Sequence, residues 1–172
     1  DILYFTENDQ RYLHNPFLFE NMEDAVDRIL DAKDEEEKVL IFGDRDVDGI
    51  TSTTILYQCL KDLGLDVQYK LPSGDDAYGI SKEVIDKFAE NYGSLIITVD
   101  CGISNNEEIA YAAEKGIDVI FFSSTHKEND YKFKQISINQ KECLNDGIKG
   151  AFRGLYNLKA AREFKKLLNT LD

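Results

Sequence analysis

Three aspartates stand at every second position of one short segment. Asp44, Asp46 and Asp48 lie within residues 43–49 and directly follow the apolar run 39–42. Crowded carboxylates resist ionising beside one another, and a divalent cation bound between them relieves that repulsion. Hard cations such as Mg²⁺ and Mn²⁺ prefer oxygen ligands. The segment therefore predicts a metal site, and the alternative is a solvated turn, because Asp and Gly are common turn residues.

A fourth aspartate, Asp100, follows a second apolar run at residues 95–99. In open parallel α/β sheets, ligands bind outside the carboxyl ends of the strands. If both runs are strands of such a sheet, the two acidic loops meet at one edge and their carboxylates hold one or two metal ions. Two ions about 4 Å apart bind a phosphate, activate a water and stabilise the leaving oxygen in an in-line displacement.

Short apolar runs alternate with amphipathic stretches along most of the chain. The apolar runs predict strands at 39–42, 67–71, 95–99, 119–122 and, more weakly, 135–138. The amphipathic stretches predict helices capped by Asn21 and ending near 32, at 51–63, after Ser81, from a Ser104–Glu107 capping box to Gly116, and at 155–168. This alternation predicts an α/β fold, with a mainly parallel sheet and helices on both faces. We expect one domain over 1–172, with a lead-in and first helix at 1–38 and the α/β core at 39–172.

Four further residues are weaker candidates for the site. Thr51 and Ser52 are expected at a helix N-terminus, where backbone N–H groups bind anions, although simple capping accounts for them equally well. His126 follows the fourth predicted strand and is a weak candidate metal ligand. Arg153 belongs to a late basic stretch that suits either a nucleic-acid backbone or the solvated face of a terminal helix.

Composition limits the classes of function. The chain has 172 residues, 42% of them hydrophobic, and a formal net charge of -13, so its overall field does not favour binding a polyanion. Its three cysteines argue against a disulfide scaffold and against a cysteine-type zinc site. No segment has the length of a membrane span, so we expect no membrane partner and a soluble, cytoplasmic protein.

The acidic segments carry a family resemblance. Residues 43–52 and 99–104 resemble the first two motifs of the DHH phosphoesterases, and within that family the RecJ-type single-strand-specific exonucleases. The segments 14–18, 78–80 and 138–141 are also similar to that group. The resemblance runs from about residue 12 to residue 139 and more weakly to 164.

The resemblance implies a metal-dependent phosphodiesterase that uses Mn²⁺ or Mg²⁺. Such an enzyme releases nucleotides from the 5′ end of single-stranded DNA, in DNA repair and recombination. By position, Asp44, Asp46 and Asp48 match the first acidic motif, and Asp100 matches the bridging aspartate. All four are implied metal ligands, and Asp46, Asp48 and Asp100 are the implied catalytic set. The implied partners are single-stranded DNA and, as a further expectation, replication or repair proteins.

The sequence also departs from the family pattern. Ser123-Ser124-Thr125 occupies the place of the Asp-His-His that names the family, and a one-residue shift would retain His126 as the last histidine. Hydroxyls are poor replacements for imidazole ligands. The glycine-rich loop at 150–155 is altered, and the family's second, substrate-holding domain would lie beyond residue 172.

Two alternatives therefore stay open at this point. One is a catalytically degenerate DHH-like domain that serves as a DNA-binding or protein-interaction scaffold. The other is a haloacid-dehalogenase-type phosphatase, in which Asp46 attacks phosphorus and Asp48 acts as acid or base, because Asp46-Val47-Asp48-Gly49 resembles that signature. That scheme leaves Asp44 without a role.

Overall fold

The computed structural model describes residues 15–19, 21–74, 76–123 and 135–139. Within these ranges the strands are β1 (Lys38–Gly43), β2 (Asp66–Lys70), β3 (Gly93–Val99), β4 (Asp118–Ser123) and β5 (Gln135–Asn139). Its helices are α2 (Met22–Asp34), α3 (Val47–Asp62), α4 (Lys82–Glu90) and α5 (Asn106–Glu114), preceded by the short 3-10 helix η2 (Pro16–Leu18).

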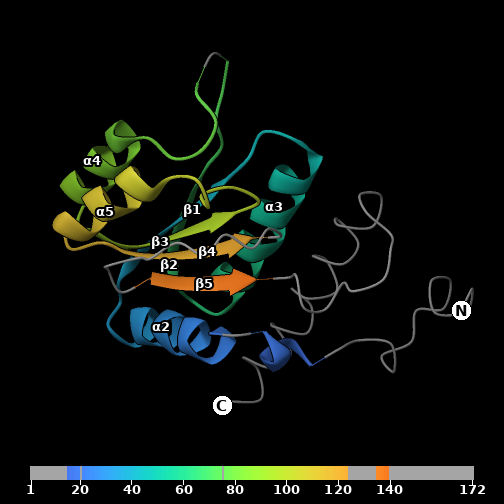
Figure 1. Ribbon diagram of the computed structural model, residues 1–172. Helices are drawn as coiled ribbons and strands as arrows, with labels where there is room; N and C mark the ends of the chain where they lie inside the picture. Colours follow the sequence, from blue (N-terminus) through green and yellow to red (C-terminus); the bar gives the residue numbers. More distant parts are fainter. Residues whose placement is uncertain (1–14, 20, 75, 124–134, 140–172) are drawn as a thin grey trace, which may run out of the picture.

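The strands form one parallel sheet in the order β2-β1-β3-β4-β5 (Figure 1). Strand β2 lies on one side of β1, and β3, β4 and β5 follow one another on the other side. This reversal creates a topological switch point between β1 and β3, the place where open α/β sheets bind their ligands.

Helices cover both faces of the sheet, as the sequence predicts (Figure 1). Alternate residues of β1 point to opposite faces, so Val39 and Ile41 pack with α2 and α3, whereas Leu40 and Phe42 pack with α4 and α5. Each fully buried aliphatic or aromatic side chain contributes about 1.5–3 kcal/mol relative to exposure. Two apolar layers therefore hold the sheet, and through it the loops at its ends.

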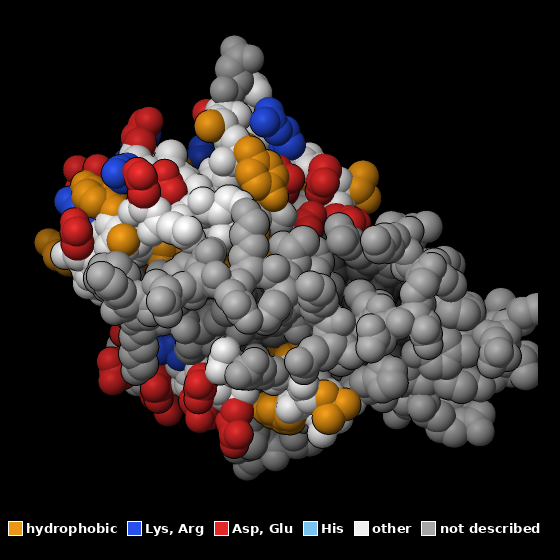
Figure 2. Space-filling model, in the orientation of Figure 1, with side chains coloured by type: hydrophobic (Ala, Val, Ile, Leu, Met, Phe, Trp, Pro, Cys, Tyr) orange, Lys and Arg blue, Asp and Glu red, His pale blue; other side chains and the backbone are white. Residues whose placement is uncertain are grey.

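Helix α2 shows the same division into a buried and an exposed side. Its apolar residues, including Ile29, are buried against the sheet. Its exposed side is strongly acidic (Figure 2) and carries Glu23, Asp24, Asp27, Asp31 and Asp34. The helix runs to Asp34 and not to residue 32, and Asn21 takes the N-cap position with a φ of 62° but makes no side-chain cap hydrogen bond.

Arg28 of α2 binds two carboxylates at the amino end of the sheet. Its Nε donates to Asp118 Oδ2 at 2.7 Å, and its Nη1 lies 2.8 Å from Glu37 Oε2. Although burial lowers the pKa of Arg28, hydrogen bonds and charge from Glu37 and Asp118 outweigh it, so the pKa is raised. This cation joins α2 to the residue before β1 and to the first residue of β4.

Two predicted helix starts are wrong. The helix expected from Thr51 begins at Val47, because the Asp46 side chain caps it by accepting the Gly49 N–H at 2.9 Å. The expected capping box at Ser104 is not formed: α5 begins at Asn106, with Asn105 in the N-cap position. The cap at Ser81 is confirmed, since its side chain accepts the Val84 N–H.

Other predictions fall beyond the described part of the chain. The terminal helix at 155–168, the altered glycine loop at 150–155 and the single-domain division of 1–172 stay predictions. Within the described residues, no helix is both long enough and apolar enough to cross a membrane.

Candidate active site

The two acidic loops leave neighbouring strands at the same level. Gly43, the last residue of β1, is the register partner of Val99, the last residue of β3. The next residues along the two strands are Asp44 and Asp100. The parallel register therefore sets the two acidic loops side by side at the switch point, as the sequence analysis expects.

The first acidic segment is divided between a loop and a helix. Asp44 is half-buried in the loop, and its Oδ1 accepts the Arg45 N–H at 2.7 Å. Asp46 is exposed at the N-cap of α3, whereas Asp48 is half-buried in the first turn of that helix. The prediction that all three aspartates lie on a loop is thus wrong for Asp48, because the cap at Asp46 starts the helix earlier.

The second acidic loop turns sharply around Asp100. This residue has a φ of 59°, in the left-handed region that costs an ordinary L-residue about 1–2 kcal/mol and that Asp tolerates better than most. The turn is held from within, because Thr98 Oγ1 donates to the Cys101 carbonyl at 3.0 Å. Gly102 has a φ of 101°, and a Cβ there would overlap the Thr98 side chain.

A third loop, between β2 and α4, closes over this turn. The Tyr78 hydroxyl donates to the Asp100 carbonyl at 3.1 Å, and Asn105 Nδ2 donates to the Ile80 carbonyl at 3.2 Å. Gly79, between them, has a φ of 83°, and a Cβ on it would overlap the Asn105 side chain. The loop thus contacts the second acidic loop through a close backbone approach and two hydrogen bonds.

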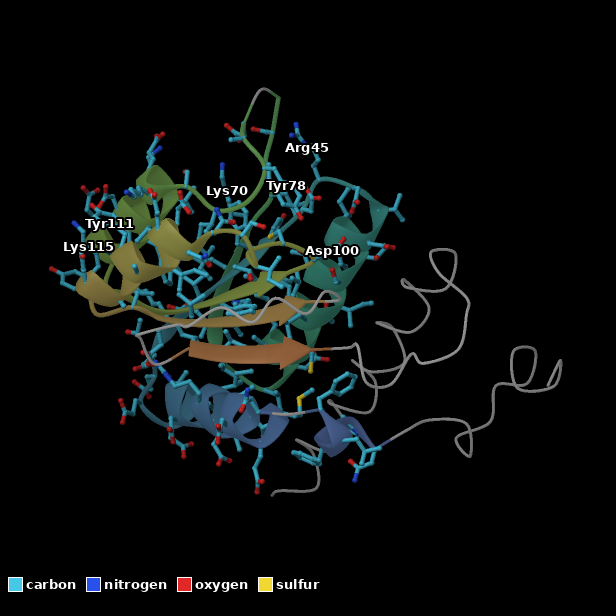
Figure 3. All side chains as sticks on the ribbon, viewed as in Figure 1. Arg45, Lys70, Tyr78, Asp100, Tyr111 and Lys115 are labelled. Atoms are coloured by element: carbon cyan, nitrogen blue, oxygen red, sulfur yellow. The ribbon has the colours of Figure 1, made fainter. Side chains whose placement is uncertain are left out.

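Arg45, between two of the aspartates, also points to this third loop. Its guanidinium donates to the Gly74 and Asp76 carbonyls at 3.1 and 3.3 Å. Figure 3 shows Arg45, Tyr78 and Asp100 at one end of the sheet, away from Tyr111 and Lys115. We call this end the acidic rim: Asp44, Asp46, Asp48 and Asp100 together with Arg45 and Tyr78. Tyr78 and Arg45 are the rim residues whose contacts the sequence reasoning missed.

Besides burial, the charges of Asp44 and Asp100 both raise the pKa of two groups at the rim, the Cys101 thiol and the Tyr78 hydroxyl. Burial, followed by the charges of Asp44 and Asp100, raises the pKa of the Cys101 thiol to about 12. Burial also raises the pKa of Tyr78, with smaller contributions from charges that include Asp44 and Asp100. Asp44 follows β1 and Asp100 follows β3, so their joint effect on one thiol and one phenol agrees with the pairing of Gly43 with Val99. The buried, protonated Cys101 is a packed residue, with its Sγ 3.6 Å from the Phe42 carbonyl oxygen.

The carboxylate oxygens of the rim are of the type that hard divalent cations bind. Asp44 and Asp46 each use one oxygen to accept a backbone N–H, and within the described ranges neither forms an ion pair. Such oxygens are the ligands that Mn²⁺ and Mg²⁺ favour. However, no three His, Cys, Asp or Glu side chains among the described residues are grouped closely enough to hold a metal ion. The donor type therefore fits, while the described part of the rim does not form a complete metal cage.

The remaining candidate residues are placed differently. The hydroxyls of Thr51 and Ser52 donate to carbonyls of their own helix, at Val47 and Asp48 respectively, so they do not cap α3. Their contact with substrate stays a prediction. His126 and Arg153 lie outside the described residues. Ser123 ends β4, and Ser124 and Thr125 lie outside the described residues.

A groove of about 970 Å³ opens beside the rim. It lies over β1 and β2, between the loop that carries Tyr78 and helix α4, and Lys70 of β2 is on its wall. The lining holds three lysines and three acidic residues, so its charge is balanced: Lys70, Lys82, Lys87, Asp76, Glu83 and Glu108. This balance does not favour a polyanion, and the groove adds space but no further acidic cluster to the site.

Comparison with known proteins identifies the family. The N-terminal domain of the DHH family matches residues 38–164, which include both acidic loops. The chain belongs to the DHH family. The single-stranded-DNA-specific exonuclease RecJ of Bacillus subtilis is 39% identical over 108 residues, which are 62% of this chain and 14% of RecJ. The RecJ of Haemophilus influenzae is 37% identical over 108 residues and is covered to 19% of its length.

Solved structures of RecJ share the DHH fold seen here. A structure of exonuclease RecJ bound to manganese aligns with a TM-score of 0.67 and 26% identity, covering 88% of this chain and 40% of that one. RecJ of Thermus thermophilus in complex with Mn²⁺ aligns with a TM-score of 0.63 and 26% identity, covering 85% and 21%. This DHH chain therefore spans only a minor part of the proteins it matches. Because the family match includes the acidic segment, it argues against the haloacid-dehalogenase-type hypothesis.

Proposed function

We propose that the chain is the catalytic core of a metal-dependent exonuclease that acts on single-stranded DNA from the 5′ end. One observation carries the proposal: the register pair Gly43–Val99 brings the Asp44 and Asp100 loops together at the switch point of a DHH fold. RecJ relatives at 34–39% identity are single-stranded-DNA-specific exonucleases, which supports this substrate class. Roles in repair and recombination, and a cytoplasmic location, belong to the same proposal.

Asp44, Asp46, Asp48 and Asp100 are the residues that would hold Mn²⁺ or Mg²⁺ in this proposal. When bound, such an ion lowers the pKa of a water and neutralises charge on the phosphate and the leaving oxygen. The chain's own contribution is to place the donors. Asp46 is fixed by its hydrogen bond to the Gly49 N–H, and Asp100 is fixed by the turn around it.

Charge on the chain limits how DNA can approach. The net charge is -13, and the exposed side of α2 is acidic, so this face repels a phosphate backbone (Figure 2). The rim is acidic too, and it attracts a polyanion only after it has bound cations. We therefore expect DNA binding to depend on divalent metal, and Mn²⁺ or Mg²⁺ to bind before the substrate does.

The second candidate function is a catalytically silent scaffold of the DHH family that binds DNA or replication and repair proteins. It is favoured by the sequence at the end of β4, where Ser123-Ser124-Thr125 stands in place of the Asp-His-His implied by the family resemblance, because hydroxyls are weaker metal ligands. It is also favoured by the lack of a three-residue metal group within the described ranges.

A nuclease assay separates the two functions. The chain is incubated with Mn²⁺ and 5′-labelled single-stranded DNA, with a duplex of the same sequence as substrate control. We expect label release from the single strand only, and its loss in Asp100→Ala. Asp86→Asn, which removes a half-buried carboxylate on α4 that Lys115 and Tyr111 bind, is the matched control and should release label normally.

The outcomes are unambiguous for the exonuclease proposal. If the chain leaves the single strand intact and Asp100→Ala behaves identically, the chain is not the enzyme proposed. Single-stranded DNA binding without turnover in a gel-shift assay would then support the scaffold. Release of label from the 5′ end by the unaltered chain, dependent on Mn²⁺, would eliminate the scaffold.

A further inference from the structure

We infer that Tyr78 is a positioning residue, whose hydroxyl fixes the orientation of Asp100 by holding its backbone carbonyl. The two residues are 22 positions apart, and the donor to the carbonyl is the phenol oxygen at 3.1 Å. Tyr78 therefore influences the position of Asp100 without itself being a proposed metal ligand. Where this inference concerns metal affinity, it rests on the proposed function.

The need for such a contact follows from the backbone at Asp100. A non-glycine residue with a φ of 59° relaxes readily to an extended conformation, which would change the direction of the Asp100 side chain. Thr98 holds the turn from the carbonyl of Cys101, one residue further on. Tyr78 holds the carbonyl of Asp100 itself, so the two hydrogen bonds fix consecutive peptide groups.

The loop that carries Tyr78 is anchored on both sides of the phenol. Asn105 donates to the Ile80 carbonyl, and Ile80 is only 4% exposed in the apolar layer beneath. On the other side, Arg45 donates to the Gly74 and Asp76 carbonyls. Because its loop is fixed at both ends, Tyr78 reaches Asp100 from a rigid support, although 58% of its own surface is exposed.

Tyr78→Phe removes the hydroxyl and keeps the ring. Tyr92→Phe makes the same chemical change at a tyrosine that is 86% exposed and stands just before β3, at the amino end of the sheet. The two variants therefore differ in whether the lost hydroxyl held Asp100. Both are made in the full 172-residue chain.

The first readout does not involve metal. Iodoacetamide labelling, followed by peptide mass spectrometry, reports how often the buried Cys101 becomes accessible, and Cys59, buried in the opposite layer, reports global opening. Loss of one hydrogen bond permits local opening about threefold to tenfold more often. We expect that increase at Cys101 in Tyr78→Phe, no change at Cys59, and no change at either thiol in Tyr92→Phe.

The second readout is Mn²⁺ affinity, measured by the electron paramagnetic resonance signal of free Mn²⁺. We expect about threefold to tenfold weaker binding in Tyr78→Phe and unchanged binding in Tyr92→Phe. A parallel rise in labelling at Cys101 and Cys59 would assign Tyr78 a merely structural role and overturn the inference, as would unchanged labelling at Cys101. If the unaltered chain binds no Mn²⁺, the proposed function fails, while the labelling result still decides the role of Tyr78.

Discussion

The carboxylates in the loop after β1 and those at the amino end of the sheet have different partners. At the amino end, Arg28 pairs with Glu37 and Asp118, and Asp86 pairs with Lys115 and the Tyr111 hydroxyl. At the carboxyl end, Asp44 and Asp46 accept backbone N–H groups and, among the residues described, form no ion pair. Arg45 is next to both, yet its guanidinium binds carbonyls of another loop.

This difference separates carboxylates that are paired within the fold from carboxylates that we propose bind a metal ion. A carboxylate that meets a cation of its own chain contributes to the fold, and losing the cation destabilises the protein. A group of carboxylates with no such partner repels itself and is stabilised by an external cation. The contrast predicts that substitutions at the amino end change stability, whereas removing a carboxylate at the rim changes metal binding.

The largest expected effect is on Mn²⁺ binding by Asp100→Asn. Asn keeps the shape of the side chain and tolerates a φ of 59°, so we expect the effect on the free energy of unfolding to be smaller than the effect on Mn²⁺ binding. Loss of a charged ligand should weaken Mn²⁺ binding by at least about 100-fold, since removing even an outer-shell partner costs about 10- to 100-fold. Isothermal titration calorimetry measures the affinity, and urea unfolding measures the stability.

Asp86→Asn is the control for this prediction from the opposite end of the contrast. It removes a carboxylate that Lys115 and Tyr111 already bind, so Mn²⁺ affinity should not change. Equal losses of Mn²⁺ affinity in the two variants would break the contrast between the ends, because a nonspecific effect of charge would then explain both.

The next effect in size tests how closely the backbone of Gly79 approaches the Asn105 side chain. Gly79→Ala introduces a Cβ that overlaps the Asn105 side chain at a φ of 83°, whereas Gly74→Ala introduces one at a φ of 56° with no heavy atom within 4 Å. The left-handed backbone alone costs about 1 kcal/mol, and the overlap should add about 1–2 kcal/mol at Gly79. Urea unfolding of both variants gives the difference, and equal losses would show that the Gly79–Asn105 approach is not tight.

The same contrast explains which parts of the structure the sequence could predict. Strands β1, β3 and β4 are found within about two residues of their predicted bounds, because their apolar runs are buried on both faces. The two loops that carry Asp44 and Asp100 leave the same edge of the sheet, as the parallel order predicts. The apolar periodicity therefore predicts the fold, and the aspartates that follow the strands predict an acidic edge.

The details of the rim depend on single hydrogen bonds that leave no periodic signal. Asp46 caps α3, which moves Asp48 from the expected loop into the first turn of the helix. Tyr78 donates to a carbonyl 22 residues away, and nothing in the neighbouring residues marks that contact. Residues 78–80 are marked in the sequence only by their similarity to the family. His126 and Arg153, outside the described residues, stay predictions.

At the amino end, Arg28→Met should lower stability without affecting the rim. The substitution leaves Glu37 and Asp118 without their cation, and their side chains are 19% and 44% exposed. Because solvent screens part of the loss, we expect a destabilisation of about 2 kcal/mol, less than for a fully buried pair. The melting temperature should fall by about 4–8 °C, measured by circular dichroism.

Lys82→Met provides the matched control for Arg28→Met. Its side chain is 52% exposed and its ammonium lies 4.0 Å from Glu107, so its loss should not measurably change the melting temperature. Mn²⁺ affinity should be unchanged in both variants. A clear fall of Mn²⁺ affinity in Arg28→Met would mean that the two ends of the sheet are coupled through the strands and do not act separately.

The smallest expected effect is a change of pKa at Asp86. A hydrogen bond from Tyr111, and then one from Lys115, hold the pKa of Asp86 below its ordinary value of 3.8. Tyr111→Phe removes the larger cause, so the pKa should rise toward 3.8 and remain below it while Lys115 is present. Carboxyl ¹³C NMR titration measures this shift, with Tyr92→Phe as the hydroxyl-loss control.

The sign of the linked stability follows from that depressed pKa. Because Asp86 is more acidic in the folded protein than in the unfolded one, its contribution to stability is complete above the unfolded pKa and is lost as the pH falls through the folded pKa. Tyr111→Phe should therefore narrow the difference in stability between neutral and acidic pH. An unchanged Asp86 pKa in this variant would mean that the carboxylate owes its low pKa to Lys115 alone, so that the Tyr111 hydrogen bond contributes nothing to the contrast between the two ends of the sheet.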